Sequence, residues 1–345
     1  MGAQANDGGR RGVGVPPARR RGARQIVRGL VPGARVVLTT HVNADGDGVG
    51  SEVALWHLLR ARGLLPVIAN PTPYPERFRF LLAQADGAEQ SARAAREIGR
   101  ADLILVCDIS DLDRIGHLGQ HVRARGVPVA CIDHHASDGT LPDGPRLVDP
   151  AAAATGELVY DLARVAGWAL EPAAARALYV ALLTDTGGFR FSNTSPRTLQ
   201  VAAHLLQHGL DPEQVYTQVY ASVPEGGVRL LAEALDTLAV EVPPGLAWLT
   251  VPPGALERHD VTSDELDGVV EFARSIAGVR LAMLFREIAG GRIKVSFRSV
   301  GDVDVMLLAR QFGGGGHRKA AGASLPGALA DVQDQVLAEA RRVLA

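Results

Sequence analysis

The residues best suited to chemistry follow one apolar run of the sequence, at 36–40. His41, Asp45 and Asp47 come within seven residues of its end. Two carboxylates beside an imidazole are costly to bring together because like charges disfavour one another, and a divalent cation would remove that cost. An Asp- and Gly-rich turn ahead of a helix is the alternative for this stretch taken alone. Residues elsewhere in the chain must distinguish a metal site from a turn.

Two further apolar runs, at 103–107 and 127–132, also end in side chains that can bind a metal ion. These side chains are Asp108 after the first run and Asp133, His134 and His135 after the second. Asp185, which lies shortly before two glycines, adds a fourth carboxylate to the candidate ligands, although an Asp near Gly is also typical of a turn.

The charge of the candidate ligands favours a site for two divalent cations. Four carboxylates carry four negative charges, whereas neutral imidazoles carry none, and this mixed set suits Mn²⁺ better than Ca²⁺ or thiolate-bound Zn²⁺. Two such ions about 3.5 to 4 Å apart can activate water and stabilise the oxygens of a phosphoryl group. The sequence offers no comparable Ser/His/Asp or Cys/His grouping and no phosphate loop, so we expect a two-metal hydrolase that uses water as its nucleophile. The six candidate ligands are His41, Asp45, Asp47, Asp108, His134 and Asp185.

Short apolar runs alternate with helical patterns, which predicts an α/β domain with a doubly wound parallel sheet. The carboxyl ends of parallel strands lie at one edge of the sheet, where ligands bind, so the candidate ligands should converge there. We expect the glycines at 46, 48 and 50 to form a tight turn and the next helix to begin near Ser51. The strand candidates lie at 35–40, 65–69, 102–107 and 127–132.

The 345 residues are enough for two domains. Residues 1–24 are rich in Arg, Gly, Ala and Pro, which predicts a disordered tail. We expect a catalytic domain at 25–210, a helical linker at 211–243 and a smaller α/β domain at 244–345. The second domain contains a glycine-rich stretch whose backbone N–H groups could wrap an anionic group. The residues of this stretch are Gly314, Gly315, Gly316 and His317.

Composition restricts the partners and the location. The formal net charge is −2, which offers no surplus of cations for long duplex nucleic acid and favours a short anionic substrate. Cys107 and Cys131 are too few for a disulfide framework, so a reducing compartment, the cytoplasm, is expected. No apolar run has the length of a membrane span, so we expect no membrane partner. A homodimer is an open alternative to a monomer.

In order and spacing these residues resemble the RecJ-like DHH phosphoesterases with a C-terminal DHHA1 domain. The length of the chain and the stretch 313–322 resemble the short nanoRNase/pAp-phosphatase subgroup. Asn43-Ala44 departs from that subgroup, which usually has a proline before the Asp. The matching stretches are His41-x-x-x-Asp45-x-Asp47, Asp108, Asp133-His134-His135, Thr184-Asp185-Thr186-Gly187 and Gly314-Gly315-Gly316-His317-x-x-Ala320-Ala321-Gly322.

The resemblance implies a role for each matching residue. It implies two Mn²⁺ ions per active site, for which Mg²⁺ or Co²⁺ could substitute, with Asp108 as the bridging ligand. The first ion would be held by His41, Asp45 and Asp108, and the second by Asp47, Asp108, His134 and Asp185. His135 would face the scissile phosphate and Asp133 would orient the adjacent histidines. Arg298 and His317, with the glycine stretch, would bind the terminal phosphate of the substrate.

Several functions fit these residues. The resemblance implies hydrolysis of very short RNA to mononucleotides and removal of the 3′-phosphate of pAp. A phosphodiesterase of pApA or cyclic di-AMP, or an exonuclease of short DNA or RNA, is an alternative that the motifs do not separate. A nucleotide-binding regulatory module with a decayed site would lack a ligand, whereas all six candidates are present. Polyphosphate hydrolysis fits less well, because a DHH relative of that kind would lack the glycine stretch.

Overall fold

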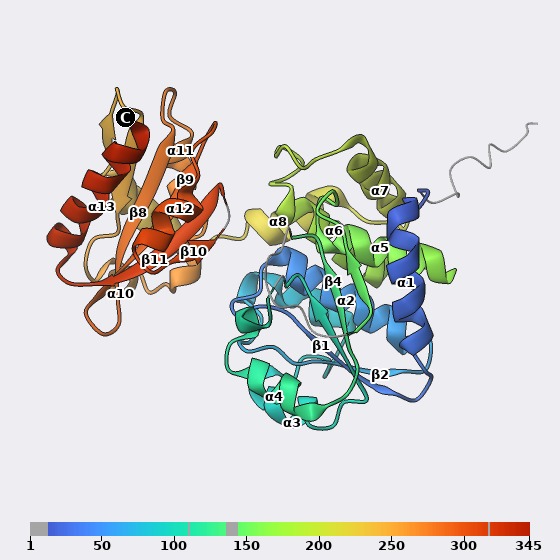
Figure 1. Cartoon of the computed structure of the whole chain (residues 1–345). Coiled ribbons are helices and arrows are strands. Elements are labelled where there is room, and N and C mark those ends of the chain that lie inside the picture. Colours follow the sequence, from blue (N-terminus) through green and yellow to red (C-terminus); the bar gives the residue numbers. More distant parts are fainter. Residues whose placement is uncertain (1–12, 110, 136–143, 317) are drawn as a thin grey trace, which may run out of the picture. The chain divides into compact units, whose positions relative to one another are not determined.

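The computed structural model describes residues 13–109, 111–135, 144–316 and 318–345, and Figure 1 shows the path of the chain. The chain divides between Ser222 and Val223 into two units, each described separately below as unit 1 and unit 2. The stretch 211–243, expected to be a helical linker, is shared between them. Helix α8 (Pro212–Tyr220) belongs to unit 1 and α9 (Glu225–Leu235) to unit 2.

Unit 1 contains a five-stranded sheet in which all neighbouring strands are parallel, in the order β2-β1-β3-β4-β5. This confirms the predicted α/β fold with a doubly wound parallel sheet. The sequence analysis did not identify the edge strand β5. The strands are β1 (Arg35–Thr39), β2 (Leu65–Ile68), β3 (Leu103–Cys107), β4 (Val129–Asp133) and β5 (Arg146–Val148).

Helices cover both faces of this sheet, because alternate residues of each strand point to opposite sides. Val36 and Leu38 of β1 join a core with α2, α5 and α6, whereas Val37 joins a second core with α3 and α4. The 3₁₀ helix η2 (Glu76–Gln84) contributes Phe78 to the first core. The helices are α2 (Gly46–Arg60), α3 (Ala94–Ile98), α4 (Leu118–Arg125), α5 (Thr155–Ala166), α6 (Pro172–Asp185) and α7 (Pro196–Leu206).

Helix α2 begins at Gly46, so the expectation of a glycine turn and a helix start near Ser51 is wrong. The glycines lie inside the first turns of α2, where the helix packs closely against α6. A Cβ on Gly46 would lie 2.4 Å from the Thr184 side chain, and one on Gly50 would lie 2.4 Å from the Ala177 carbonyl oxygen. Gly46 and Gly50 are therefore explained by the approach of two helices, which we call the α2–α6 contact.

The N-terminal segment is ordered from residue 13, so the predicted disordered tail at 1–24 is wrong for residues 13–24. Helix α1 (Pro17–Gly29) packs on unit 1, and Arg19 on it is buried. The Arg19 guanidinium contacts the carboxylates of Asp149 at 2.5 Å, Glu157 at 2.6 Å and Asp161 at 2.8 Å. A buried Arg satisfied in this way fixes α1 to α5. Residues 1–12 lie outside the described ranges.

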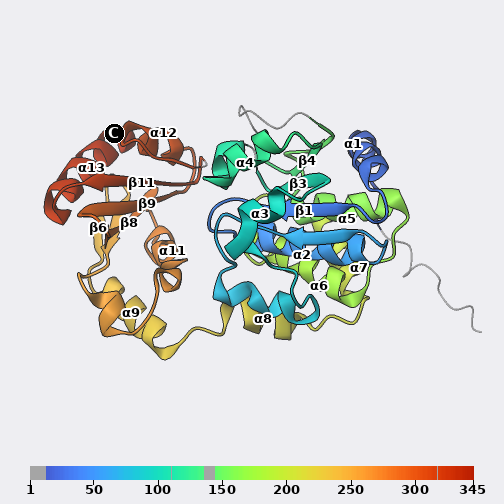
Figure 2. The ribbon, with the colours of Figure 1, turned by 90° about the horizontal axis from the view of Figure 1, so that it is seen from below.

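Unit 2 has a six-stranded sheet in the order β10-β11-β9-β8-β7-β6, in which only the pair β7·β8 is parallel. Figure 2 shows α12 (Val305–Gln311) and α13 (Leu329–Leu344) on one face of this sheet and α9 and α11 (Val269–Arg274) on the other. Each face has its own core. The strands are β6 (Ala239–Glu241), β7 (Leu246–Thr250), β8 (Leu281–Ile288), β9 (Arg292–Ser299), β10 (Gly315–Gly316) and β11 (Ala320–Pro326); the short helix α10 spans Ala255–Arg258. None of the helices within the described ranges combines the length and hydrophobicity of a membrane span.

Candidate metal and catalytic site

The turn from β1 into α2 carries the first three candidate ligands. The Asp45 side chain caps α2, since its Oδ1 accepts hydrogen bonds from the backbone N–H groups of Asp47 and Gly48, both at 3.1 Å. His41 is buried, and its Nε2 lies 3.8 Å from Oδ2 of Asp45 and 3.4 Å from Oδ2 of Asp108. This Nε2 has no hydrogen-bond partner among the described residues, as expected for a ring nitrogen that binds a metal ion.

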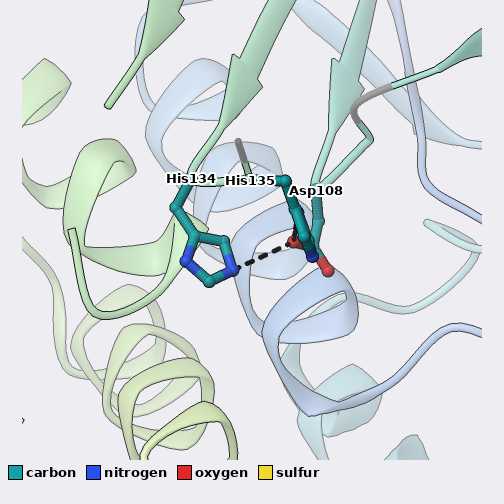
Figure 3. Close-up of side chains that lie close together, drawn as sticks. All are labelled: Asp108, His134 and His135. Carbon is teal, nitrogen blue, oxygen red and sulfur yellow. Dashed lines mark ion pairs between the residues drawn. The ribbon is translucent and has the colours of Figure 1, made fainter. Parts of the chain in front are cut away.

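Asp108 lies at the centre of the site, directly after β3. Its backbone is left-handed, with φ at 59°, and its side chain is 2% exposed. His134 Nε2 and His135 Nδ1 lie 3.6 and 3.4 Å from its Oδ1, and Figure 3 shows both rings beside the carboxylate. Asp108 therefore contacts candidate ligands from β1 on one side and β4 on the other.

The two histidines after β4 have different contacts. His134 Nδ1 lies 3.3 Å from the Ala152 carbonyl oxygen, so a proton on Nδ1 leaves Nε2 facing the carboxylates. The Nε2 atom is 3.7 Å from Asp47 Oδ2 and 3.5 Å from Asp185 Oδ2. His135 Nδ1 lies 2.7 Å from Oδ1 of the fully buried Asp133. Asp133 thus orients His135.

Asp185 is the last residue of α6, and its carboxylate contacts His134. Asn193, in the loop after α6, holds it: its Nδ2 donates to the carbonyl oxygens of Asp185, at 3.1 Å, and Ala153, at 2.9 Å. The sequence analysis did not identify Asn193, because no motif marks a side chain that acts on a backbone carbonyl.

The six candidate ligands lie together, as the convergence argument predicts. Their donor atoms fall into compact groups in which all atoms lie within 4.8 Å of one another. Asp108 belongs to the first two groups, and His135 joins the second although we expected it to face the substrate. The groups are His41 with Asp45 and Asp108, Asp108 with His134 and His135, and Asp47 with His134 and Asp185.

The carboxyl groups of this site differ in the direction of their pKa shifts. Burial, together with the charges of Asp108, Asp185 and Asp45, raises the pKa of Asp47 well above its ordinary range. Burial and the charges of Asp108 and Asp45 raise the pKa of Asp185 to about 8. For Asp108 burial also acts to raise the pKa, but its contacts with His41 and the other histidines lower it below the ordinary range. Neighbouring carboxylates that cannot all ionise are the environment that a bound cation would neutralise.

Backbone groups of α5 hold the Asp47 carboxylate. Its two oxygens accept hydrogen bonds from the N–H groups of Thr155, at 2.6 Å, and Gly156, at 2.8 Å. The Thr155 hydroxyl donates to Asp108 Oδ1 at 3.2 Å. The amino end of a helix favours negative charge, so the position of α5 stabilises two ligands at once. Thr155 is a further residue that the sequence analysis did not identify.

A buried polar network of Glu52, Asn70 and Tyr74 also fixes the turn between β1 and α2. Glu52 of α2 is fully buried, and its Oε2 accepts hydrogen bonds from Asn70 Nδ2 at 2.8 Å and the Tyr74 hydroxyl at 2.7 Å. Asn70 Oδ1 in turn accepts from the backbone N–H of Thr40 at 2.9 Å. The network therefore reaches the residue before His41.

The candidate phosphate-binding residues lie in unit 2. Arg298 of β9 is partly exposed, and its Nε lies 3.2 Å from Oε1 of Glu271 on α11. Gly315 and Gly316 form β10, which pairs with β11, and a Cβ on Gly314 would lie 2.2 Å from the Gly322 carbonyl oxygen. The expected glycine loop is therefore partly a strand edge. His317 lies outside the described residues.

A parallel sheet with carboxylates and imidazoles at the carboxyl ends of its strands is the arrangement of a site that can hold divalent cations for hydrolysis. The N-terminal domain of the DHH family matches residues 35–182, and the DHHA1 domain matches residues 246–345. The chain belongs to the DHH family.

Relatives match nearly the whole length of the chain. The bifunctional oligoribonuclease and PAP phosphatase NrnA of Thermus thermophilus is 32% identical over 89% of this chain and 89% of its own length. The protein of the same description from Bacillus subtilis is 30% identical over 91% and 96%. The crystal structure of an exopolyphosphatase-related protein from Bacteroides fragilis covers 94% of this chain and 98% of its own, with 26% identity and a TM-score of 0.87.

Proposed function

We propose that this protein is a two-metal phosphohydrolase that degrades very short RNA to mononucleotides and removes the 3′-phosphate of pAp. The observation that carries the proposal is Asp108, whose carboxylate contacts His41 on one side and His134 on the other. The descriptions of the relatives from Thermus thermophilus and Bacillus subtilis support both substrates.

The donor set fits two divalent cations, for which we propose Mn²⁺. Three observations support this fit: a buried Nε2 on His41 with no hydrogen-bond partner among the described residues, a raised pKa at Asp47 and a raised pKa at Asp185. Ligands that combine carboxylates with imidazoles suit Mn²⁺. Bound cations would supply an activated water and neutralise charge on the phosphate during displacement.

The residues of the chain then divide the remaining tasks. His41, Asp45 and Asp108 would hold one cation, and Asp47, Asp108, His134 and Asp185 the other. Asp133 fixes the ring of His135 beside Asp108, where that ring would face the scissile phosphate. In unit 2, Arg298 would release Glu271 and bind the terminal phosphate through its guanidinium fork, with Gly314, Gly315, Gly316 and His317 nearby in sequence. We also propose a cytoplasmic location, because Cys107 and Cys131 are buried free thiols.

The test uses 5′-labelled RNAs from two to twenty-four nucleotides, together with pAp, in Mn²⁺. We expect phosphate release from pAp and the fastest cleavage on the shortest RNAs, and the pattern of labelled products gives the direction of attack. Metal analysis of the loaded protein should give two ions per chain. Equal rates on two and twenty-four nucleotides, or no release from pAp, would contradict the proposed substrate class.

A further inference from the structure

Unit 1 contains a cavity of about 180 Å³ beside the candidate metal ligands. Asp45 and Asp185 line it together with Arg77 and Phe78 of η2 and with Tyr220, the last residue of α8. Carboxylates of the candidate metal site therefore share this cavity with a cationic and aromatic wall, formed by Arg77, Phe78 and Tyr220.

That wall is anchored to the helix that carries Asp185. The Tyr220 hydroxyl donates to the Leu183 carbonyl oxygen at 3.3 Å, two residues before Asp185 on α6. Tyr220 is 39% exposed, so part of its side chain is accessible, whereas Phe78 is buried. Arg77 is exposed, and its guanidinium carbon lies 4.7 Å from the centroid of the Phe78 ring. Aromatic rings and guanidinium groups are the side chains on which nucleobases stack.

The two proposed substrates differ in what is attached to the scissile phosphate. In pAp that phosphate is a monoester and carries one nucleoside, whereas the phosphate that links two nucleotides is a diester and carries two. An enzyme that hydrolyses both therefore needs a site for the second nucleoside, which pAp leaves empty. A cavity of this volume is smaller than the roughly 300 to 1,000 Å³ of typical pockets for drug-sized ligands, so it suits one such group.

We propose that this cavity binds the second nucleoside of an oligonucleotide, with its base against Tyr220 and Arg77. The inference rests on the proposed function and deepens it, because it assigns a specificity site for diesters within unit 1. Binding there would place the linking phosphate beside Asp45 and Asp185, which line the same cavity.

The test compares kcat/KM for pApA with kcat/KM for pAp in the full-length protein. The variants are Tyr220→Ala and Arg77→Ala. Tyr220→Phe keeps the ring, and Arg79→Ala removes a neighbouring exposed Arg of the same helix, which pairs with Glu76 at 3.6 Å and does not line the cavity. We expect the ratio of pApA to pAp efficiency to fall about tenfold or more in the two Ala variants, as stacking energies of bases on aromatic rings imply.

The ratio should remain within about twofold of wild type in Arg79→Ala, which leaves the stacking surface intact. It should fall less in Tyr220→Phe than in Tyr220→Ala, because Tyr220→Phe keeps the ring and loses only the hydrogen bond to Leu183. Equal losses on both substrates would show that the wall supports the site as a whole and would overturn the inference, as would an unchanged ratio in both Ala variants. A wild-type protein active on pAp and pApA supports the proposed function whatever the variants do. A wild-type protein inactive on both overturns the proposed function and the inference with it.

Discussion

Asp108 has a backbone conformation that determines how its role can be tested. Its φ of 59° is left-handed, a conformation that Asn and Asp adopt more readily than Ala. Asp108→Asn should therefore reduce activity by about 100-fold or more, as loss of an electrostatic catalytic group does, while the protein stays folded. Activity and urea denaturation should be measured together, with the exposed Asp113→Asn as the matched control. An Asp108→Asn protein that keeps more than about a tenth of the activity would contradict the bridging role.

Arg298 should affect binding more than chemistry, since the candidate ligands lie in unit 1. Arg298→Ala removes charge-assisted hydrogen bonds to a phosphate, so KM should rise roughly tenfold or more with a smaller effect on kcat. Arg292→Ala, at the other end of β9, is the matched control because that side chain bonds Ser324 at 2.9 Å. Steady-state kinetics on a dinucleotide would refute this division of tasks if kcat fell while KM stayed constant.

Glu52 should make the stability of the protein fall as pH rises. Burial raises its pKa to about 8, from an ordinary value of 4.5, although the hydrogen bonds from Asn70 and Tyr74 act to lower it. Between these two values the folded state keeps a proton that the unfolded state has lost, so rising pH favours unfolding by up to about 1.4 kcal/mol per pH unit. Glu52→Gln removes this titration and should flatten the pH dependence of urea denaturation between pH 5 and 8. Identical pH profiles for the two proteins would exclude the effect.

At the scale of elements, the sequence was enough to predict that the candidate ligands converge at one edge of the sheet. It was not enough to predict which other residues hold these ligands in place by hydrogen bonds. Asp108 and His134 each follow an apolar run, and parallel strands bring such positions to one edge whatever the side-chain details. Thr155 and Gly156 contribute backbone N–H groups, which every residue except proline has, so no residue type identifies them. Asn193 likewise acts on carbonyl groups that carry no sequence signal.

Long-range contacts explain the elements that the sequence analysis placed wrongly. Gly46 and Gly50 favour a turn by local propensity, but the α2–α6 contact requires them inside a helix. The residues around Arg19 have the composition that is typical of a disordered tail. The carboxylates that hold Arg19 in place lie 130 to 142 residues further along the chain. No local pattern contains either kind of information.

The α2–α6 contact predicts that Gly50→Ala is harmful although Gly50 touches no ligand. The added methyl group would lie 2.4 Å from a backbone oxygen of α6, which cannot rotate away, so the two helices must separate. We expect a loss of roughly 1 to 3 kcal/mol in the free energy of unfolding, the usual range for overpacking, and a lower affinity for metal ions. Gly29→Ala is the matched control, since a Cβ there meets no atom within 4 Å. Calorimetry of both variants would disprove the explanation if they behaved alike.

At the scale of the whole molecule, the two units should respond differently to metal ions. The candidate ligands lie in unit 1, and cations that bind only the folded state stabilise it by about 2.7 kcal/mol at a hundred times Kd. Differential scanning calorimetry should therefore show two transitions, of which Mn²⁺ raises one. Asp47→Asn should abolish that rise, because it removes a carboxylate from the donor group with His134 and Asp185. A rise of equal size in both transitions would contradict the assignment of all metal ligands to unit 1.

The separate cores of the two units have a consequence for how the chain could be produced. Residues 221–224, between α8 and α9, are exposed, and the hydrophobic clusters on each side contain residues of one unit only. A gene divided within this segment would encode two polypeptides, each with complete sheets and complete cores. The first would carry the carboxylates and the nucleoside cavity, and the second would carry Arg298. Coexpression of the two halves could then report, through recovered turnover, how much a covalent connection contributes to catalysis on a short substrate.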